Sequence, residues 1–333
     1  MMNTTLNVRQ SNYECLRLVC MLMVMICHAN GHVQQGDIMG IEGFCKIAVN
    51  QFCFVCVNVF IMISGWFGIK ASWKKAGALL FQVAFWGILC FLCAKIIGLP
   101  VSFQEHLLPV LLFGKHYWFV VTYLILFSIA PILNAFQNQV TEKEYFYALI
   151  LFFSAELIYG FLLDAGHYAF GFSPLSFIGL YLLAGYVRRF PGKIFTLTKG
   201  YDLAIYLLVT LLSIAGIWFG YKWFGMGFHL NHYDSPLAII ASVFFFLYFS
   251  KLSFNSRIIN WLAASAFAIY LAHENIIISP YYHQLFRDLK EAVPFIAFYP
   301  SMLALLLLMG LLFIMIDKPR IWIWNHISGS RNN

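Results

Sequence analysis

The chain has 333 residues, of which 62% are hydrophobic and 11% are charged. Soluble domains are about 45–50% apolar and about 25% charged, so this composition excludes a water-soluble globular protein. A helical protein with many membrane spans fits it, because lipid surrounds the apolar surface. The net charge of +7 could suggest nucleic acid, but the Lys and Arg residues are scattered in short loops between apolar segments. We therefore expect no nucleic-acid partner.

Apolar stretches near the membrane-spanning length of about 20 residues recur along the whole chain. The first could pass for a signal-peptide core, but Glu14 and Arg17 interrupt its approach and no small-residue cleavage site follows. We interpret it as a retained span. The sequence thus predicts an all-α transmembrane bundle, forming one domain over 1–333, with about ten spans: 12–31, 47–67, 76–97, 117–137, 145–163, 174–187, 202–220, 235–250, 259–280 and 295–316.

The distribution of Lys and Arg residues predicts the orientation of the bundle. With the N-terminus inside, fourteen of these cations fall on the inner side, among them Arg9 and Arg331, and five fall on the outer side. Cytoplasmic loops are enriched in positive charge. The count therefore favours both termini inside and an even number of spans.

The first span carries two ionisable residues, Arg17 and His28, although a charged group in a span costs at least ~2.5 kcal/mol. They are eleven residues apart, which places them within about 20° of one azimuth and about 16 Å apart along a helix. Glu14 lies three residues before Arg17 and can pair with it. Two interpretations remain: a chemical site on one helix face, or a packing device in which Arg17 extends inward and His28 bonds a carbonyl.

His273 and Glu274 form a second polar candidate, near the end of the ninth span. Neighbouring residues of a helix point about 100° apart, so we expect that both cannot face one spot. One of the two is expected to face the cavity, and for His273 a satisfied structural His is the alternative.

The eight cysteines all lie between residues 15 and 93. Two pairs, Cys53 with Cys56 and Cys90 with Cys93, have metal-like spacing but no His or carboxylate beside them. We interpret them as free packed thiols and expect no metal site.

Four segments resemble motifs of the acyltransferase family 3 membrane proteins, in family order. The opening helix of that family has a basic residue, ten intervening residues and a His, as in Arg17 to His28. Residues 59–67 (VFIMISGWF) resemble its Phe-rich Ser-Gly second span, and 116–123 (HYWFVVTY) with 131–134 (PILN) its fourth-span signature. Residues 267–273 (FAIYLAH) resemble a late span ending in Tyr-Leu-x-His.

The chain departs from the family pattern at three points. Lys70, Lys74 and Lys75 stand where the family often has Arg, and Glu14 stands where Asp is usual. The C-terminal hydrolase-like domain that some members carry is absent from this sequence. The closer resemblance is to stand-alone members that O-acetylate surface glycans or their lipid-linked precursors in the bacterial inner membrane.

The resemblance implies transfer of an acyl group, usually acetyl, from acyl-CoA to a hydroxyl of a glycan or lipid-linked glycan. No cofactor is held permanently. Arg17, Lys70, Lys74 and Lys75 are expected to meet the CoA phosphates on the inner side. The thin acyl-bearing arm would then run along the first helix face toward His28.

His28 is expected to act as general base on the acceptor hydroxyl or to carry the acyl group transiently, and His273 is a second catalytic candidate. Trp118, Tyr123, Tyr270 and Glu274 are substrate-binding candidates; the aromatic residues could instead simply fill the bundle.

A transporter that exports a polar or lipid-linked solute is the competing function. Such a protein could also place His and Arg in its core for proton coupling. It would more often show repeated halves with helices broken by Gly or Pro, and no halves of matching pattern are visible in this sequence.

Overall fold

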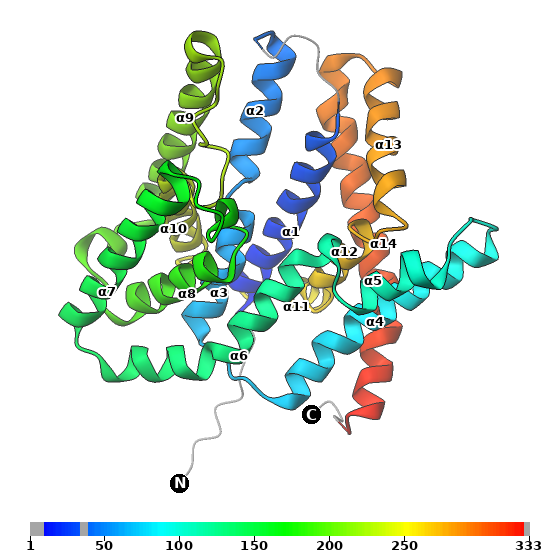
Figure 1. Cartoon of the computed structure of the whole chain (residues 1–333), viewed down its shortest axis with the longest axis horizontal. Coiled ribbons are helices and arrows are strands. Elements are labelled where there is room, and N and C mark those ends of the chain that lie inside the picture. Colours follow the sequence, from blue (N-terminus) through cyan, green and yellow to red (C-terminus); the bar gives the residue numbers. More distant parts are fainter. Residues whose placement is uncertain (1–9, 34–38, 330–333) are drawn as a thin grey trace.

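The computed structural model describes residues 10–33 and 39–329, and throughout these residues it is helical and contains no strand (Figure 1). The predicted all-α fold is confirmed. Arg9 and Arg331, two of the predicted inner-side cations, lie outside the described residues. Helix α1 begins and helix α14 ends at the same end of the bundle, the lower end in Figure 1.

Seven helical segments of the described chain are long and apolar enough to cross a membrane. Two of them are composite: α2 joins α3 through one turn, and α7 continues into a π-helical segment at Glu156–Leu162. The seven are α1 (Ser11–Gly31), α2 with α3 (Ile41–Cys53 and Cys56–Phe67), α4 (Trp73–Ile96), α6 (Trp118–Gln139), α7 (Glu142–Ala155) with its extension, α9 (Lys199–Phe224) and α14 (Phe295–Ile327).

The remaining helices are shorter. Helices α8 (Pro174–Arg189) and α10 (Pro236–Ser250) coincide with the sixth and eighth predicted spans. The count of ten spans stays a prediction. The other short elements are α5 (Leu108–Leu111), α11 (Arg257–Ala263), α12 (Ala266–His273), α13 (Ser279–Ala292), a π-turn at Phe103–Leu107 and 3₁₀ turns at Lys115–Tyr117, Ala169–Gly171 and Lys193–Thr196.

The ninth predicted span, 259–280, is not a single helix. It is divided into α11, α12 and a turn that leads into α13. The buried side chain of Asn275 accepts a hydrogen bond from the Ile277 amide at 3.0 Å, which closes a turn just after α12. Proline in the first turn of α13 suits a helix start. The apolar run is uninterrupted in the sequence, which is why a single span was predicted here.

Helix α1 lies in the middle of the bundle and contacts α2, α3, α10, α11, α12, α13 and α14 (Figure 1). Its side chains Leu16, Cys20, Met25 and Ala29 are buried. A helix surrounded in this way points each of its polar side chains at another helix, because little of its surface remains for lipid. The central position of α1 therefore determines which groups can meet His28.

The Ser-Gly motif and the fourth-span signature meet where α3 packs on α8. A Cβ atom at Gly65 would lie 2.2 Å from the Tyr181 carbonyl oxygen, so only glycine permits this approach. Gly68 ends α3 with a positive φ of 71°. The Tyr181 hydroxyl then donates to the Asn134 side chain at 2.6 Å and accepts from the Ile69 amide at 2.8 Å.

Two ion pairs lie inside the bundle: one is within α14 and reaches α4 through Trp86, and the other joins α10 to α9. Arg320 donates twice to the buried Asp317 carboxylate at 2.7 Å, and Trp86 of α4 donates to the same carboxylate at 3.0 Å. Lys251, just after α10, pairs at 2.5 Å with Asp202 of α9. Each pair satisfies charges that would otherwise be costly in an apolar interior.

Gly65→Ala should destabilise the protein by about 1–3 kcal/mol, because the added methyl group collides with backbone rather than with a flexible side chain. Gly31→Ala is the control, since nothing lies within 4 Å of a Cβ at that position. Thermal unfolding in detergent measures both. Equal melting temperatures for the two variants would contradict the proposed α3–α8 contact.

Asp317→Ala should lower the free energy of unfolding by about 3–5 kcal/mol, because it leaves the Arg320 guanidinium buried without its counter-charge. Glu142→Ala removes an exposed carboxylate in the first turn of α7 and should change stability by less than about 1 kcal/mol. Denaturant unfolding of the purified proteins compares them. An Asp317→Ala protein as stable as wild type would show that neither the pair with Arg320 nor the bond from Trp86 of α4 contributes to stability.

Candidate active site

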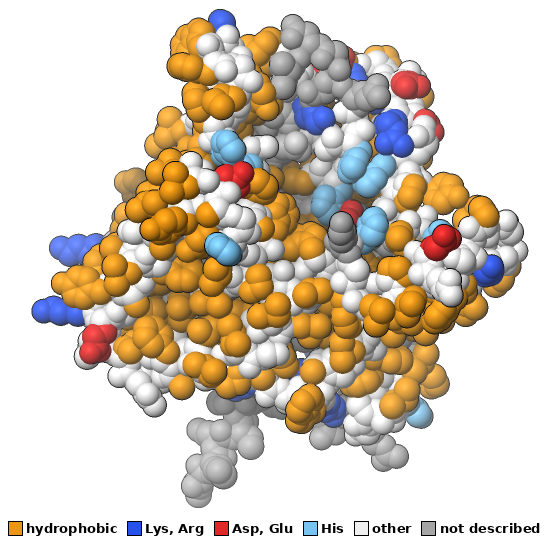
Figure 2. Space-filling view, viewed as in Figure 1, with side chains coloured by type: hydrophobic (Ala, Val, Ile, Leu, Met, Phe, Trp, Pro, Cys, Tyr) orange, Lys and Arg blue, Asp and Glu red, His pale blue; other side chains and the backbone are white. Residues whose placement is uncertain are grey.

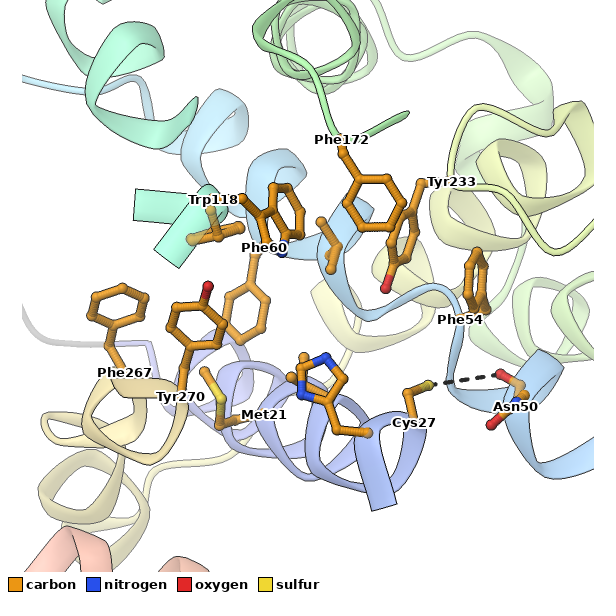
Figure 3. A pocket seen from close by; sticks show the side chains of 14 residues that line it. Met21, Cys27, Asn50, Phe54, Phe60, Trp118, Phe172, Tyr233, Phe267 and Tyr270 are labelled. Carbon is orange, nitrogen blue, oxygen red and sulfur yellow. Dashed lines mark hydrogen bonds between the residues drawn. The ribbon is translucent and has the colours of Figure 1, made fainter. Parts of the chain in front are cut away.

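A central cavity of about 870 Å³ lies beside α1. Aromatic rings from several elements surround it, including Phe60 of α3, Trp118 of α6, Phe172, Tyr233 and Tyr270 (Figure 3). The remaining lining side chains are Met21, Val24, Cys27, His28, Asn50, Phe54, Val57, Phe119 and Phe267. The cavity is thus mostly apolar and holds one imidazole.

His28, His273 and Glu274 meet at one point, although they come from α1 and from the end of α12. The Nδ1 atom of His28 lies 3.0 Å from Nε2 of His273 and 2.9 Å from Oε1 of Glu274. The expectation that His273 and Glu274 cannot face the same spot is wrong. Helix α12 ends at His273, and Glu274 has turn geometry (φ −90°, ψ 2°), so helical spacing does not apply between them.

Neighbouring side chains fix the end of α12. The buried Tyr117 hydroxyl donates to the Leu271 carbonyl at 2.6 Å and accepts from Asn275 at 3.3 Å. On the other side, Tyr282 of α13 donates to the Met25 carbonyl of α1 at 2.6 Å, and its ring centre lies 5.2 Å from that of His273. The end of α12 is therefore held by the 3₁₀ turn before α6, and α13, which packs against His273, is bonded to α1.

The hydrogen-bond partners determine the tautomer of both imidazoles. Nδ1 of His273 lies 2.5 Å from the Ile269 carbonyl, which can only accept, so this nitrogen carries the proton and Nε2 offers a lone pair. The Glu274 carboxylate is likewise an acceptor. Nδ1 of His28 faces both acceptors and must donate. The neutral His28 ring therefore has its lone pair on Nε2, the nitrogen left for the cavity.

Two further histidines lie just beyond this cluster. His32 stacks on His283 of α13, with ring centres 3.5 Å apart and an interplanar angle of 20°. Burial, followed by the neighbouring His28, lowers the pKa of His32, and burial together with His32 lowers the pKa of His283 to about 4. Both rings are neutral at pH 7. Figure 2 shows His side chains gathered on one wall of the central hollow.

A second cavity, of about 960 Å³, lies at the end of α3, and we call it the basic cleft. Lys70, Arg188 and Arg189 supply its cations and Asn134, Gln137 and Asn138 its amides; Gly65, Trp66, Phe67, Gly68 and Gly185 complete it. Arg188 donates to the Trp66 carbonyl, and its guanidinium lies 5.9 Å from the centre of the Trp66 ring.

Helix α3 joins the two cavities. Phe60 lines the central cavity and Gly65 the basic cleft, five residues or about 7.5 Å further along the helix. Between these levels Ser64 and Tyr123 lie 3.4 Å apart, oxygen to oxygen. Tyr123, a predicted substrate-binding residue, therefore lies between the cavities and not in the wall of the central one, whereas Trp118 and Tyr270 do line it.

The predicted donor-binding cations do not all meet at the basic cleft. Arg17 pairs with Glu14 at 2.7 Å, as expected, but its side chain is 37% exposed and lines neither cavity. Lys70 lines the cleft, whereas Lys74 and Lys75 are exposed in the first turn of α4. From the sequence, Arg188 and Arg189 count only among the fourteen predicted inner-side cations. Their adjacency at the end of the short helix α8 is the sequence signal that could have pointed to the cleft.

The comparison with protein families agrees with the arrangement of these motifs. A family model described as an acyltransferase domain, that of acyltransferase family 3, matches residues 10–316. No match to the chain was found among curated proteins or solved structures. The match includes α1, the basic cleft and the His28 cluster, and with seven membrane-length helices it indicates an integral membrane acyltransferase. The chain therefore belongs to acyltransferase family 3.

Proposed function

We propose that this protein is an O-acyltransferase of the bacterial cytoplasmic membrane. It transfers an acyl group, acetyl by family default, from cytoplasmic acyl-CoA to a hydroxyl of a cell-surface glycan or its lipid-linked precursor. The observation that carries the proposal is the His28 imidazole in an apolar cavity, with Nδ1 held by His273 and Glu274. A neutral, oriented imidazole is the group that hydroxyl activation near pH 7 requires.

The reaction balances with the groups present. Nε2 of His28 takes the proton of the acceptor hydroxyl while the hydroxyl oxygen attacks the carbonyl carbon of the thioester. The carbon–sulfur bond breaks, and the thiolate of CoA receives the proton back from His28. The Glu274 carboxylate, 2.9 Å from Nδ1, stabilises the imidazolium between these two transfers. His273 acts by positioning the ring, because its Nε2 accepts from the same nitrogen.

Transient acylation of His28 is the alternative within the same reaction class. The Nε2 lone pair that would accept a proton would then attack the thioester carbonyl directly, with release of CoA. The acceptor hydroxyl would take the acyl group in a second step. Rapid quenching with labelled acetyl-CoA and no acceptor distinguishes the two routes: label on a His28 peptide favours the acyl carrier.

The basic cleft is the proposed site for the phosphates of acyl-CoA. Arg188 and Arg189 with Lys70 supply permanent cations for phosphate oxygens, and the amides of Asn134 and Asn138 add donors. The acyl-bearing arm would follow α3 past the Ser64–Tyr123 contact to the central cavity. In this proposal the phosphates stay at the inner end and only the thin arm enters the bundle.

The acceptor is proposed to enter the central cavity from the outer side. The rings of Phe172 and Tyr233, with centres 5.0 Å apart, lie in its wall, and Trp118 lies 4.6 Å from Phe172. Flat aromatic faces suit the apolar faces of sugar rings. The transporter alternative loses support, because the family match covers nearly the whole chain.

His28→Ala should lower acyl transfer by about 10²–10⁴-fold, because no other group takes the hydroxyl proton. Glu274→Gln should lower the rate of acyl transfer less than His28→Ala does, since the His28 ring stays in place but loses the carboxylate charge that stabilises the imidazolium. The exposed His326→Asn, at the far end of α14, is the control. Transfer of labelled acetyl in membranes, with mass spectrometry of the glycan, measures activity; full activity of His28→Ala would refute the proposed chemistry.

Arg188→Ala should raise KM for acetyl-CoA by about tenfold or more and change kcat less, because a charge-assisted bond to phosphate is worth about 1.5–3 kcal/mol. Arg188→Lys, which keeps the charge, should fall between that variant and wild type. Lys199→Ala removes an exposed cation in the first turn of α9 and serves as the control. An unchanged KM in Arg188→Ala would place the phosphates elsewhere.

A further inference from the structure

The cluster that orients His28 also has the composition of a transition-metal site. One ligand atom from each of His28, His273 and Glu274 lies within 4.8 Å of the other two. Two ligands of a four-coordinate Zn²⁺ ion, each at about 2.0–2.1 Å from the metal, lie about 3.3 Å apart. The separations at Nδ1 of His28 are 3.0 and 2.9 Å. A shift of a few tenths of an ångström would bring these two separations to the Zn²⁺ value, and the third, between His273 and Glu274, is within 4.8 Å.

The surroundings of the cluster support coordination in two ways. His273 donates Nδ1–H to the Ile269 carbonyl, the second hydrogen bond that metal-binding histidines usually make, which directs its Nε2 lone pair at the centre of the cluster. His28 and Glu274 keep 30% and 18% of their side-chain surface exposed, so an ion can reach them. A water molecule would supply the fourth ligand, as in zinc sites that have three protein ligands.

We propose that His28, His273 and Glu274 form an inhibitory binding site for a divalent transition metal of the Zn²⁺ class. Two imidazoles and one carboxylate suit Zn²⁺ and Co²⁺, whereas Mg²⁺ prefers oxygen ligands and water. This site is not visible in the sequence, where helical spacing separates His273 from Glu274 and nothing places His28 beside them, so that only the cysteine pairs have metal-like spacing.

The bound metal would inhibit the enzyme because metal binding and catalysis both use Nδ1 of His28. Catalysis needs the proton on Nδ1 of His28 and the lone pair on Nε2. Coordination through Nδ1 displaces that proton, and the neutral ring then carries its proton on Nε2, where it can no longer accept one from the acceptor hydroxyl. The metal also neutralises Glu274. The inhibitory effect rests on the proposed function; the binding itself does not.

Cobalt absorption tests the site independently of activity. The full chain, purified in detergent, is titrated with Co²⁺, and four-coordinate binding is read from the visible absorption band, which Zn²⁺ should abolish by competition. Glu274→Gln, which keeps the side-chain size, and His273→Gln should each weaken Co²⁺ binding at least about tenfold. His326→Asn should bind like wild type. Circular dichroism and gel filtration confirm that each variant is folded.

Acyl-transfer assays test the effect of the metal. Zn²⁺ should inhibit the wild-type and His326→Asn proteins, a chelator should restore activity, and Mg²⁺ at the same concentration should not inhibit. The residual activity of Glu274→Gln should need at least about tenfold more Zn²⁺ for half inhibition. An absorption band that persists in both ligand variants, or faster transfer with Zn²⁺, would overturn the proposal. Metal binding without any measurable transfer would refute the proposed function and leave the site standing.

Discussion

One imidazole nitrogen, Nδ1 of His28, faces two acceptors inside the bundle. Ring orientation, tautomer and the availability of Nε2 all follow from this contact. It exists only because α12 ends at His273 and the next residue turns back toward α1. Two tyrosines support this arrangement: Tyr117 donates to the Leu271 carbonyl of α12, and Tyr282 donates to the Met25 carbonyl of α1.

The two cavities differ in chemical character. Cations gather at the basic cleft, which α3 reaches at Gly65, and the His28 imidazole lies in the wall of the central cavity, which α3 reaches at Phe60, about 7.5 Å away along the helix. Glycine at position 65 permits the close α3–α8 contact that brings Arg188 and Arg189 beside Lys70. The Ser-Gly motif therefore shapes the cleft through packing, and its serine contributes only at the boundary between the cavities.

The length of the apolar stretches predicted the all-α bundle, and helical spacing predicted the Glu14–Arg17 pair. Helical spacing did not predict the meeting of His273 and Glu274, because an apolar run carries no sign of a turn closed by the buried Asn275 side chain. It also missed Arg188, since convergence of α3, α6 and α8 is a tertiary property that no local pattern contains.

Because the basic cleft and the central cavity are separate, the bundle would not need to open a path for the whole donor molecule, as a transporter does for its solute. Carrying phosphates through the bundle would cost several kcal/mol for each buried charge, and the described walls of the central cavity are largely aromatic. If the phosphates remain at the basic cleft, only a neutral thioester has to reach His28. Only a thin chain would then have to pass the contact between Ser64 and Tyr123, and separating two side chains that share one 3.4 Å hydrogen bond requires no rearrangement of the helices.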